Sequence, residues 1–265
     1  MPDVSANGIK IHYEERGEGD PLVLIMGLGA DGSLWEDHVK EYEQHFRCIL
    51  MDNRGAGQSD KPEGPYSTKM MADDTAGLMD ALGIDKAHIA GISMGGAIGQ
   101  ELALNHPDKV RSLVLVSTWA KCNNYAVTVF EHFRKIRETA KPDNFLELLQ
   151  LWIFAPPFYE GNMDGLREGQ QDAADNPEPM PQHAFSGQCD ACINHDTIGR
   201  LDQIKAPTLI TIGDQDIFTP PAFSEYLNEN ISGSEIFWLK GCGHAHHWED
   251  LESYNSKTSS FMQQH

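Results

Sequence analysis

Short apolar runs alternate with longer amphipathic stretches along most of this chain, and this rhythm constrains its fold more than any other feature. The runs read as strands at 9–14, 22–26, 47–51, 87–92, 112–117, 207–213 and 235–241. The amphipathic stretches read as helices at 34–45, 68–82, 94–105, 220–230 and 249–263. Strands that alternate with helices indicate an α/β fold with a mostly parallel central sheet and helices on both of its faces.

The rhythm stops at about residue 119 and resumes at about residue 201. The segment between has helical stretches, no convincing strand, and proline-rich breaks at 155–157 and 176–181. Ligands of open α/β sheets bind beyond the carboxyl ends of the strands. We therefore expect residues 119–200 to form a helical cap (lid) over that edge. Residues 1–118 and 201–265 would together form the α/β core.

The charge balance narrows the choice of partners. The chain has 40 Asp and Glu against 20 Lys and Arg, a formal net charge of -20, which disfavours binding to nucleic acid or to an anionic membrane. Its five cysteines are scattered, which is typical of a reducing compartment rather than a disulfide framework. We see no signal peptide and no membrane-spanning stretch, and we expect a cytoplasmic protein.

The strongest chemical signal is the pattern G-x-S-x-G in Gly91-Ile92-Ser93-Met94-Gly95. The pattern alone is weak, but here it lies between an expected strand and an expected helix. A sharp turn at that point would expose the Ser93 hydroxyl at the sheet edge, and the helix dipole would favour negative charge beside it. Ser93 is thus the candidate nucleophile, and a plain glycine-rich turn is the alternative.

A serine hydroxyl needs a general base, and the base needs an acid that orients it. The expected strand 207–213 is followed by two candidates for the acid, Asp214 and Asp216. The expected strand 235–241 is followed by the candidate base, His244. All of them lie just past the carboxyl end of a strand, on the same edge as Ser93.

With these motifs the chain resembles the α/β-hydrolase superfamily over essentially its full length. Within it the chain is similar to 3-oxoadipate enol-lactonase-like and carboxylesterase hydrolases. The resemblance is carried by MGLG (26–29), DNRGAGQSD (52–60), GISMGG (91–96), GDQDIFTP (213–220) and GCGHAHHWE (241–249). The start of the cap, STWAKCNN (117–124), also resembles that of aminoacrylate hydrolases.

The resemblance implies roles for particular residues. It makes Asp216, rather than Asp214, the acid of the triad, and His244 the base. It implies an oxyanion hole formed by the backbone N–H groups of Leu28 and Met94. The family usually has His-Gly where this chain has Met-Gly at 26–27, which would change the hydrogen bonding of that loop while leaving the backbone donor in place.

Several other residues permit rival interpretations. Histidines 246 and 247 beside His244 suggest a metal, but three such close histidines cannot converge on one ion from a short loop, so we expect no metal and no cofactor. Cysteines 189 and 192 are expected one turn apart in a cap helix, as small packing residues. Four cap aromatics are candidates either for the substrate pocket or for the interior of the cap, namely Trp119, Trp152, Phe154 and Phe158.

The sequence therefore predicts a serine hydrolase that cleaves a small carboxylic ester or lactone through an acyl-enzyme. The same triad would serve an enol-lactonase, a C–C bond hydrolase or an aminoacrylate-type C–N hydrolase, and the residues do not separate these. A different class remains open as well: a ligand receptor built on a hydrolase fold. Because basic residues are few at 119–200, we expect neutral substrates to be preferred to carboxylate-bearing ones.

Overall fold

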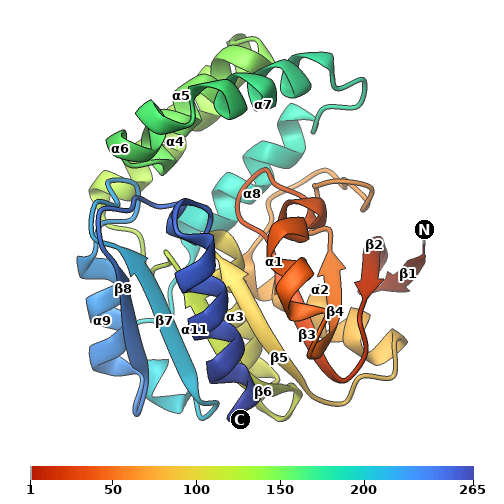
Figure 1. Ribbon diagram of the computed structural model, residues 1–265. Helices are drawn as coiled ribbons and strands as arrows, with labels where there is room; N and C mark the ends of the chain where they lie inside the picture. Colours follow the sequence, from red (N-terminus) through yellow and green to blue (C-terminus); the bar gives the residue numbers. More distant parts are fainter. Residues whose placement is uncertain (1) are drawn as a thin grey trace.

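The computed structural model describes residues 2–265, and its central feature is an eight-stranded sheet with helices on both faces (Figure 1). The strand order is β1-β2-β4-β3-β5-β6-β7-β8. The strands are β1 (Asp3–Ala6), β2 (Ile9–Arg16), β3 (Asp20–Ile25), β4 (Phe46–Met51), β5 (Ala87–Ile92), β6 (Val110–Val116), β7 (Thr208–Gly213) and β8 (Glu235–Leu239). The α/β class with a mostly parallel sheet, predicted from the alternating pattern, is thus confirmed.

The parallel part of the sheet extends from β4 to β8, whereas the amino-terminal edge is antiparallel. Strand β2 pairs antiparallel with both β1 and β4. Strand β1 is not among the strands predicted from the sequence, although a signal for it was present. Asn7 and Gly8 join β1 to β2, both with positive φ, and Asn-Gly strongly favours a tight hairpin turn. This edge lies away from the turn at the end of β5 that carries Ser93.

Side chains of the sheet alternate between two hydrophobic layers, because successive residues of a strand point to opposite faces. In β3, Leu22 and Leu24 pack with Trp35 and Tyr254, whereas Val23 and Ile25 pack on the other face. The first layer is covered by α1 (Glu36–Tyr42) and α11 (Leu251–Gln263). The second is covered by α2 (Thr68–Ala81), α3 (Met94–Asn105) and α9 (Ala222–Asn230) (Figure 1).

Most predicted core elements are found near their expected bounds, and β5 and α3 match 87–92 and 94–105. Two differ in detail. The predicted helix 34–45 is a short 3-10 helix, η1 (Gly32–Trp35), followed by α1. The predicted carboxyl-terminal helix is preceded by a separate turn of helix, α10 (His246–Glu249). Two more short 3-10 segments are η2 (Pro107–Lys109) and η3 (Leu201–Gln203).

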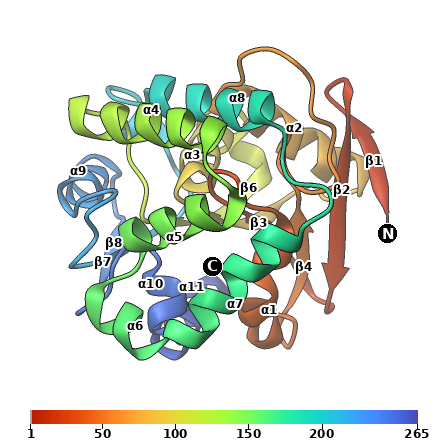
Figure 2. The same ribbon diagram turned by 90° about the horizontal axis from the view of Figure 1, so that it is seen from above.

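Five helices lie between β6 and β7 and cover the carboxyl ends of the strands (Figures 1 and 2). We call them the cap helices: α4 (Asn124–Thr139), α5 (Pro142–Ile153), α6 (Pro156–Gly161), α7 (Met163–Asp175) and α8 (Gln182–Asn194). The predicted proline-rich break at 155–157 falls at the start of α6, and the one at 176–181 falls between α7 and α8. Proline has no backbone N–H to donate, so it suits the first turn of a helix and ends the one before it.

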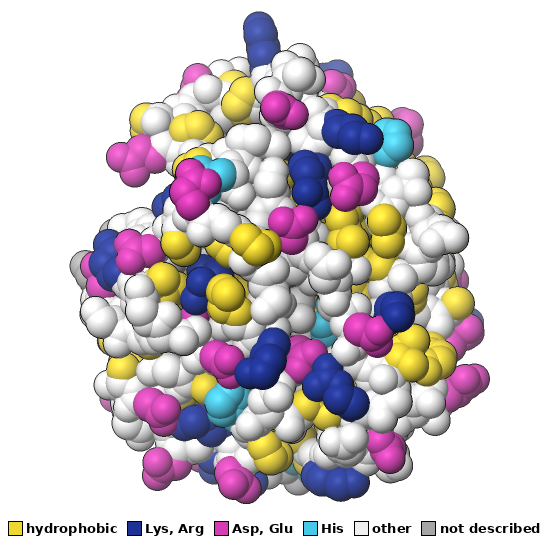
Figure 3. Space-filling view, turned by 180° about the vertical axis from the view of Figure 1, so that it is seen from behind, with side chains coloured by type: hydrophobic (Ala, Val, Ile, Leu, Met, Phe, Trp, Pro, Cys, Tyr) yellow, Lys and Arg dark blue, Asp and Glu magenta, His cyan; other side chains and the backbone are white. Residues whose placement is uncertain are grey.

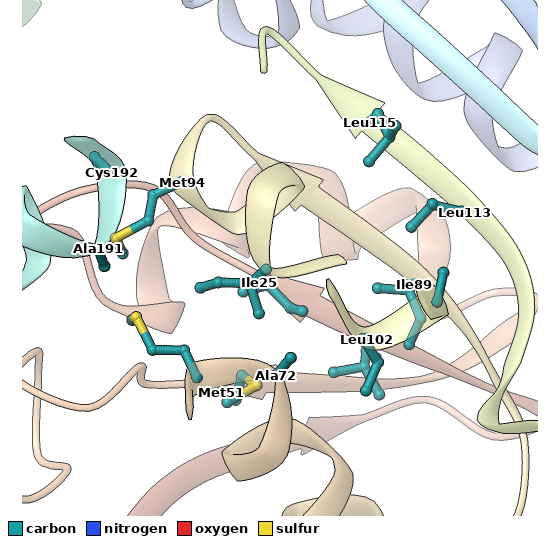
Figure 4. Packing of buried hydrophobic residues seen from close by; sticks show 14 of the residues in the cluster. Ile25, Met51, Ala72, Ile89, Met94, Leu102, Leu113, Leu115, Ala191 and Cys192 are labelled. Atoms are coloured by element: carbon teal, nitrogen blue, oxygen red, sulfur yellow. The ribbon is translucent and has the colours of Figure 1, made fainter. Parts of the chain in front are cut away.

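Helix α8 packs directly on the core. Figure 4 shows its residues Ala191 and Cys192 beside Met94, at the start of α3. Cys189 and Cys192 are fully buried and unoxidised, and they serve as packing residues, as predicted. Burial raises the pKa of the Cys189 thiol to about 12, which makes this thiol unreactive.

Charged side chains are spread over the surface. On the face shown in Figure 3, Lys and Arg side chains are interspersed with Asp and Glu. Within residues 2–265, none of the helices combines the length with the apolar character that crossing a membrane requires.

Candidate active site

The turn that carries Ser93 joins β5 to α3 in a strained conformation. Ser93 has φ 56° and ψ -113°, a region that residues with a side chain rarely adopt. Its N–H donates to Val116 O at 2.8 Å, and its carbonyl accepts a hydrogen bond of 2.8 Å from Thr118 Oγ1. The end of β6 therefore holds this turn from both sides, and such over-determined strain is typical of functional sites.

Two glycines of the motif allow the chain to pack around this turn. A Cβ atom on Gly91 would lie 2.2 Å from Gly95 O, and one on Gly95 would lie 2.1 Å from Ile25 O. Neither position has room for a side chain. The close packing brings the loop after β3 against Ser93, since a Cβ on Gly27 would be 3.3 Å from Ser93 Cβ.

His244 and Asp216 meet at the same edge of the sheet. His244 Nδ1 lies 2.9 Å from Asp216 Oδ2, and the two residues are only 5% and 3% exposed. Asp216 Oδ1 accepts hydrogen bonds of 2.8 Å from the N–H groups of Phe218 and Thr219. A carboxylate can only accept, so this contact puts the imidazole proton on Nδ1 and leaves Nε2 free to take another.

Thr219 completes this pair, and the sequence analysis overlooked it. Its Oγ1 lies 2.8 Å from Asp216 Oδ2 and 2.9 Å from His244 Nδ1. The ring of the neighbouring Phe218 lies 4.7 Å from the imidazole, centroid to centroid. The two residues lie two and three positions after Asp216 in sequence, and this position was the available signal.

Asp214, the rival acid, lies elsewhere. It is exposed, and its Oδ1 accepts a 2.7 Å hydrogen bond from the N–H of Gly241. It therefore ties together the loops that follow β7 and β8, without contacting the imidazole. Of the two candidates, the structure brings only Asp216 to His244.

The end of β6 connects the serine turn to the histidine loop. Val116 and Thr118 bond the backbone of Ser93, while Ser117 Oγ donates to His244 O at 2.9 Å. Within residues 2–265, no hydrogen bond joins Ser93 Oγ to His244. In unliganded enzymes such contacts are often long and shorten only when substrate binds.

The loop between β3 and η1 carries Leu28, and its backbone faces a buried amide. The N–H of Gly29 donates to Gln188 Oε1 at 2.8 Å, and Gln188 Nε2 donates to Arg54 O at 2.9 Å. The N–H groups of Leu28 and Met94 donate to no acceptor within residues 2–265. They therefore remain free to bind an oxyanion, and the N-terminus of α3 adds its dipole to that of Met94.

Met26 replaces the histidine usual in the resembling family. Its side chain is 2% exposed and packs in the core layer with Trp35. Its backbone carbonyl accepts a 2.9 Å hydrogen bond from Asn53 Nδ2. The loop is therefore held by Asn53 and Gln188, and the position of its backbone does not depend on an imidazole at residue 26.

The four predicted pocket aromatics fall into two separate places. The Trp119 ring lies 5.4 Å from Phe130, which lies 5.3 Å from Phe218, the ring that contacts His244. Trp152 joins the same aromatic cluster through Phe133, at 5.9 Å. These two tryptophans therefore belong to the interior between the cap and the catalytic loops.

Phe154 and Phe158 lie at a different position. Their rings stack at 4.8 Å and line a groove of ≈ 400 Å³ together with Trp248. Other lining residues come from the segments after the Leu28 loop and after the His244 loop, among them Leu34, Glu36, Asp37 and Leu251. The groove thus runs between α6 and α7 on the cap side and η1, α1, α10 and α11 on the core side, and no Lys or Arg lines it.

The other two histidines of the HAHH run (244–247) point away from the site. His246 lies between Ser117 Oγ, at 3.1 Å, and Thr211 Oγ1, at 2.9 Å. His247 Nδ1 lies 3.1 Å from Nε2 of the buried His38. Burial lowers the pKa of His246 to about 3 and that of His38 to about 4, so both imidazoles are neutral near pH 7. Residues 2–265 contain no cluster of His, Cys, Asp or Glu suited to holding a metal ion.

Comparisons with known proteins agree with this architecture. A family model described as the alpha/beta hydrolase fold matches residues 20–251. A candidate carbamate hydrolase, RutD, from Azorhizobium caulinodans is 30% identical over 246 residues, which cover 92% of each chain. The crystal structure of an enol-lactonase from Burkholderia xenovorans superposes with a TM-score of 0.90 at 27% identity, covering 99% of this chain and 100% of the enol-lactonase.

An esterase from Exiguobacterium antarcticum has a TM-score of 0.86 at 25% identity, with 98% of each chain covered. The similarity therefore extends over whole chains, cap helices included. The proteins that share it carry names of different activities: a carbamate hydrolase, an enol-lactonase and an esterase.

Proposed function

Since the chain belongs to the α/β-hydrolase family, we propose that it cleaves a small carboxylic ester or lactone with Ser93 as nucleophile, His244 as base and Asp216 as the orienting acid. The observation that carries the proposal is the 2.9 Å contact between His244 and Asp216, at the sheet edge where the strained Ser93 turn lies. Backbone strain that the surrounding structure holds in place clusters at active sites.

The proposed reaction is a two-step acyl transfer. His244 Nε2 takes the proton of Ser93 Oγ as this oxygen attacks the substrate carbonyl, and the oxyanion binds the N–H groups of Leu28 and Met94. His244 then protonates the leaving alkoxide, which departs and leaves an ester on Ser93. In the second step His244 activates a water molecule that hydrolyses this ester. Both steps use only protein groups and water.

The charges around the site support a neutral substrate. The groove beside Phe154 and Phe158 has Glu36 and Asp37 in its lining and no basic residue. Several cap-segment cations are already paired with carboxylates, as in Lys121–Asp196, Arg134–Asp190 and Arg200–Glu101. We propose that the cap helices, the lid expected at 119–200, admit an uncharged acyl or alcohol group along this groove.

Arg137 is the strongest argument for an anionic substrate instead. It forms no ion pair within the described residues 2–265, and burial lowers its pKa. Its guanidinium carbon lies 4.7 Å from the centre of the Phe185 ring, and a Cβ atom on Gly29 of the Leu28 loop would lie 3.2 Å from that ring. However, its N–H groups already donate to Met180 O and Gln182 Oε1. A bound carboxylate would have to displace these contacts, and this favours the neutral substrate.

A second candidate function is cleavage of a carbamate C–N bond, favoured by the 30% identity to the candidate carbamate hydrolase. The test compares kcat/KM for p-nitrophenyl acetate, an unsubstituted five-membered lactone and a simple alkyl carbamate. We expect ester or lactone turnover at least about tenfold above that of the carbamate, because the carbamate nitrogen donates electron density to the carbonyl and makes its carbon less electrophilic. A carbamate preference would establish the second function, and release of one equivalent without turnover would indicate a receptor.

A further inference from the structure

The backbone around His244 is held from three directions. The N–H of Gly243 donates to Glu249 Oε1 at 2.9 Å, and the N–H of Ala245 donates to Ile153 O at 2.8 Å. The carbonyl of His244 itself accepts from Ser117. Each of the residues 243–245 thus has a hydrogen-bond partner for its backbone. Two of these partners, Glu249 and Ile153, lie in α10 and α5, outside the strand-end segments that carry Asp216 and Ser93.

Glu249 also contacts the cap. The same Oε1 accepts a second hydrogen bond, of 3.2 Å, from the N–H of Ala155 in the turn between α5 and α6. One carboxylate oxygen thus joins that cap turn to the residue before His244. The second oxygen, Oε2, accepts no hydrogen bond within residues 2–265, so the contact depends on a single acceptor atom.

The packing around Gly243 leaves no room for a side chain at this position. A Cβ atom on Gly243 would lie 2.8 Å from both Ala155 N and Ile153 O, and 3.1 Å from Glu249 Oε1. The glycine therefore lets the cap turn and the base loop meet backbone to backbone. Glu249 is partly buried there, and this desolvation raises its pKa, the two N–H contacts acting against it.

We propose that Glu249 is a positioning residue, which sets the imidazole of His244 and fixes the α5–α6 turn of the cap against the base loop. This inference rests on the proposed function, in which His244 is the base. Proton transfer is sensitive to small misplacements, and a displacement of about 1 Å can cost about 100-fold in rate. Loss of the acceptor would therefore slow the reaction even though Glu249 does not touch the reacting atoms.

The test compares Glu249→Ala with Glu249→Gln, using p-nitrophenyl acetate, a substrate too small to need the groove. Alanine removes the acceptor, and kcat should fall about 10- to 100-fold. Glutamine keeps an oxygen at Oε1 and loses only the charge, so kcat should stay within about threefold of the wild type. Glu252→Ala, at an exposed position of the next helix, is the matched control and should leave kcat unchanged. The proposal is wrong if alanine retains kcat within about twofold, or if glutamine is as damaging as alanine.

A second measurement separates the positioning role from the proposed function and from misfolding. The rate at which a small fluorophosphonate labels Ser93 reports on the base without any turnover. If the wild type is not labelled at Ser93, the proposed function fails. If Glu249→Ala is labelled as fast as the wild type, the positioning role fails. Should Glu249→Ala not fold, Glu249→Asp keeps the charge but withdraws the acceptor by one methylene, and it should show the same slower labelling.

Discussion

The catalytic edge of the core and the outer cap helices differ in how fully their residues are buried. Every residue of β5 and β7, the strands that precede Ser93 and Asp216, is buried. In contrast, α7 buries Leu166 alone and α6 buries none of its residues. The positions of the proposed catalytic side chains are thus fixed by many contacts at once, whereas the outer cap has few contacts that would resist change in its sequence.

Helix α8 shows that the difference in burial does not coincide with the boundary between the core and cap segments in sequence. It belongs to the cap segment in sequence, yet it packs as a core helix, with Gln188, Cys189 and Cys192 fully buried. Gln188 also contacts the Leu28 loop. The boundary that matters therefore separates α8, which packs with the core, from the outer helices α5, α6 and α7. Phe158 lies in α6, and Phe154 lies just before it.

The largest expected effect is at the core edge. Ser93→Ala should lower kcat for p-nitrophenyl acetate by about 10⁶, because no other group in the site can form the acyl-enzyme. The cap variant Phe158→Ala, measured beside it, should keep kcat within about tenfold of the wild type. Retention of a tenth of the activity in Ser93→Ala would rule out this nucleophile and would remove the contrast between the two regions.

The next effect separates two aspartates of one loop. Asp216→Asn should lower kcat by about 10⁴, because the amide would hold His244 in the wrong tautomer. Asp214→Asn, which alters only the contact with Gly241, should mainly change stability. Steady-state kinetics and a thermal melt of both variants provide the test. If both variants lost the same factor in kcat, the assignment of Asp216 rather than Asp214 as the acid would be wrong.

The third prediction concerns pH and the buried histidines of the core. Burial lowers the pKa of His38 and His88 to about 4 and that of His246 to about 3, all below their usual value of 6.5. Between pH 6.5 and about 4 these histidines therefore bind protons in the unfolded chain but remain neutral in the folded chain. Stability is fully present above pH 6.5 and is lost as the pH falls from there towards 4.

Each fully shifted histidine should cost roughly 1 kcal/mol of unfolding free energy per pH unit in that window. Urea unfolding at pH 7.5, 6.5 and 5.5 measures the loss. The exposed cap residue His132 is the control, and His132→Gln should leave the pH dependence unchanged. Constant stability from pH 7.5 to 5.5 would show that the core histidines are solvated.

The smallest expected effect belongs to the cap. The kcat/KM for a short neutral ester should be about tenfold higher than that for its carboxylate-bearing isostere. This ratio corresponds to a cost of ~1.4 kcal/mol for one uncompensated charge. The comparison is made at two salt concentrations, since salt screens long-range repulsion. A preference for the anion that weakens with salt, and that disappears in Arg137→Gln, would identify Arg137 as a substrate contact.

Local patterns made much of the core predictable. The bounds of β5 and α3 follow from an apolar run, a glycine-flanked serine and an amphipathic stretch, all within twenty residues. The order of Ser93, Asp216 and His244 along the chain, each after a strand, was equally readable. A parallel sheet brings the carboxyl ends of its strands to one edge, so these residues could be placed together without coordinates.

Other features depended on contacts between distant parts of the chain. No local pattern shows that Gln188 contacts Gly29, 159 residues away, or that Glu249 contacts Ala155, 94 residues away. The cap aromatics look alike in sequence, yet Trp119 lies in the cluster that reaches His244 while Phe158 lines the groove.

The sequence by itself determined the order of the candidate residues Ser93, Asp216 and His244 along the chain and the position of each after a strand, because a strand and the turn after it are encoded within a few neighbouring residues. The tertiary structure decided which acid meets the base, which aromatics reach the site and how the cap attaches. Those choices depend on side chains and backbone groups that approach through space, and a single sequence holds no record of which distant residue each one meets.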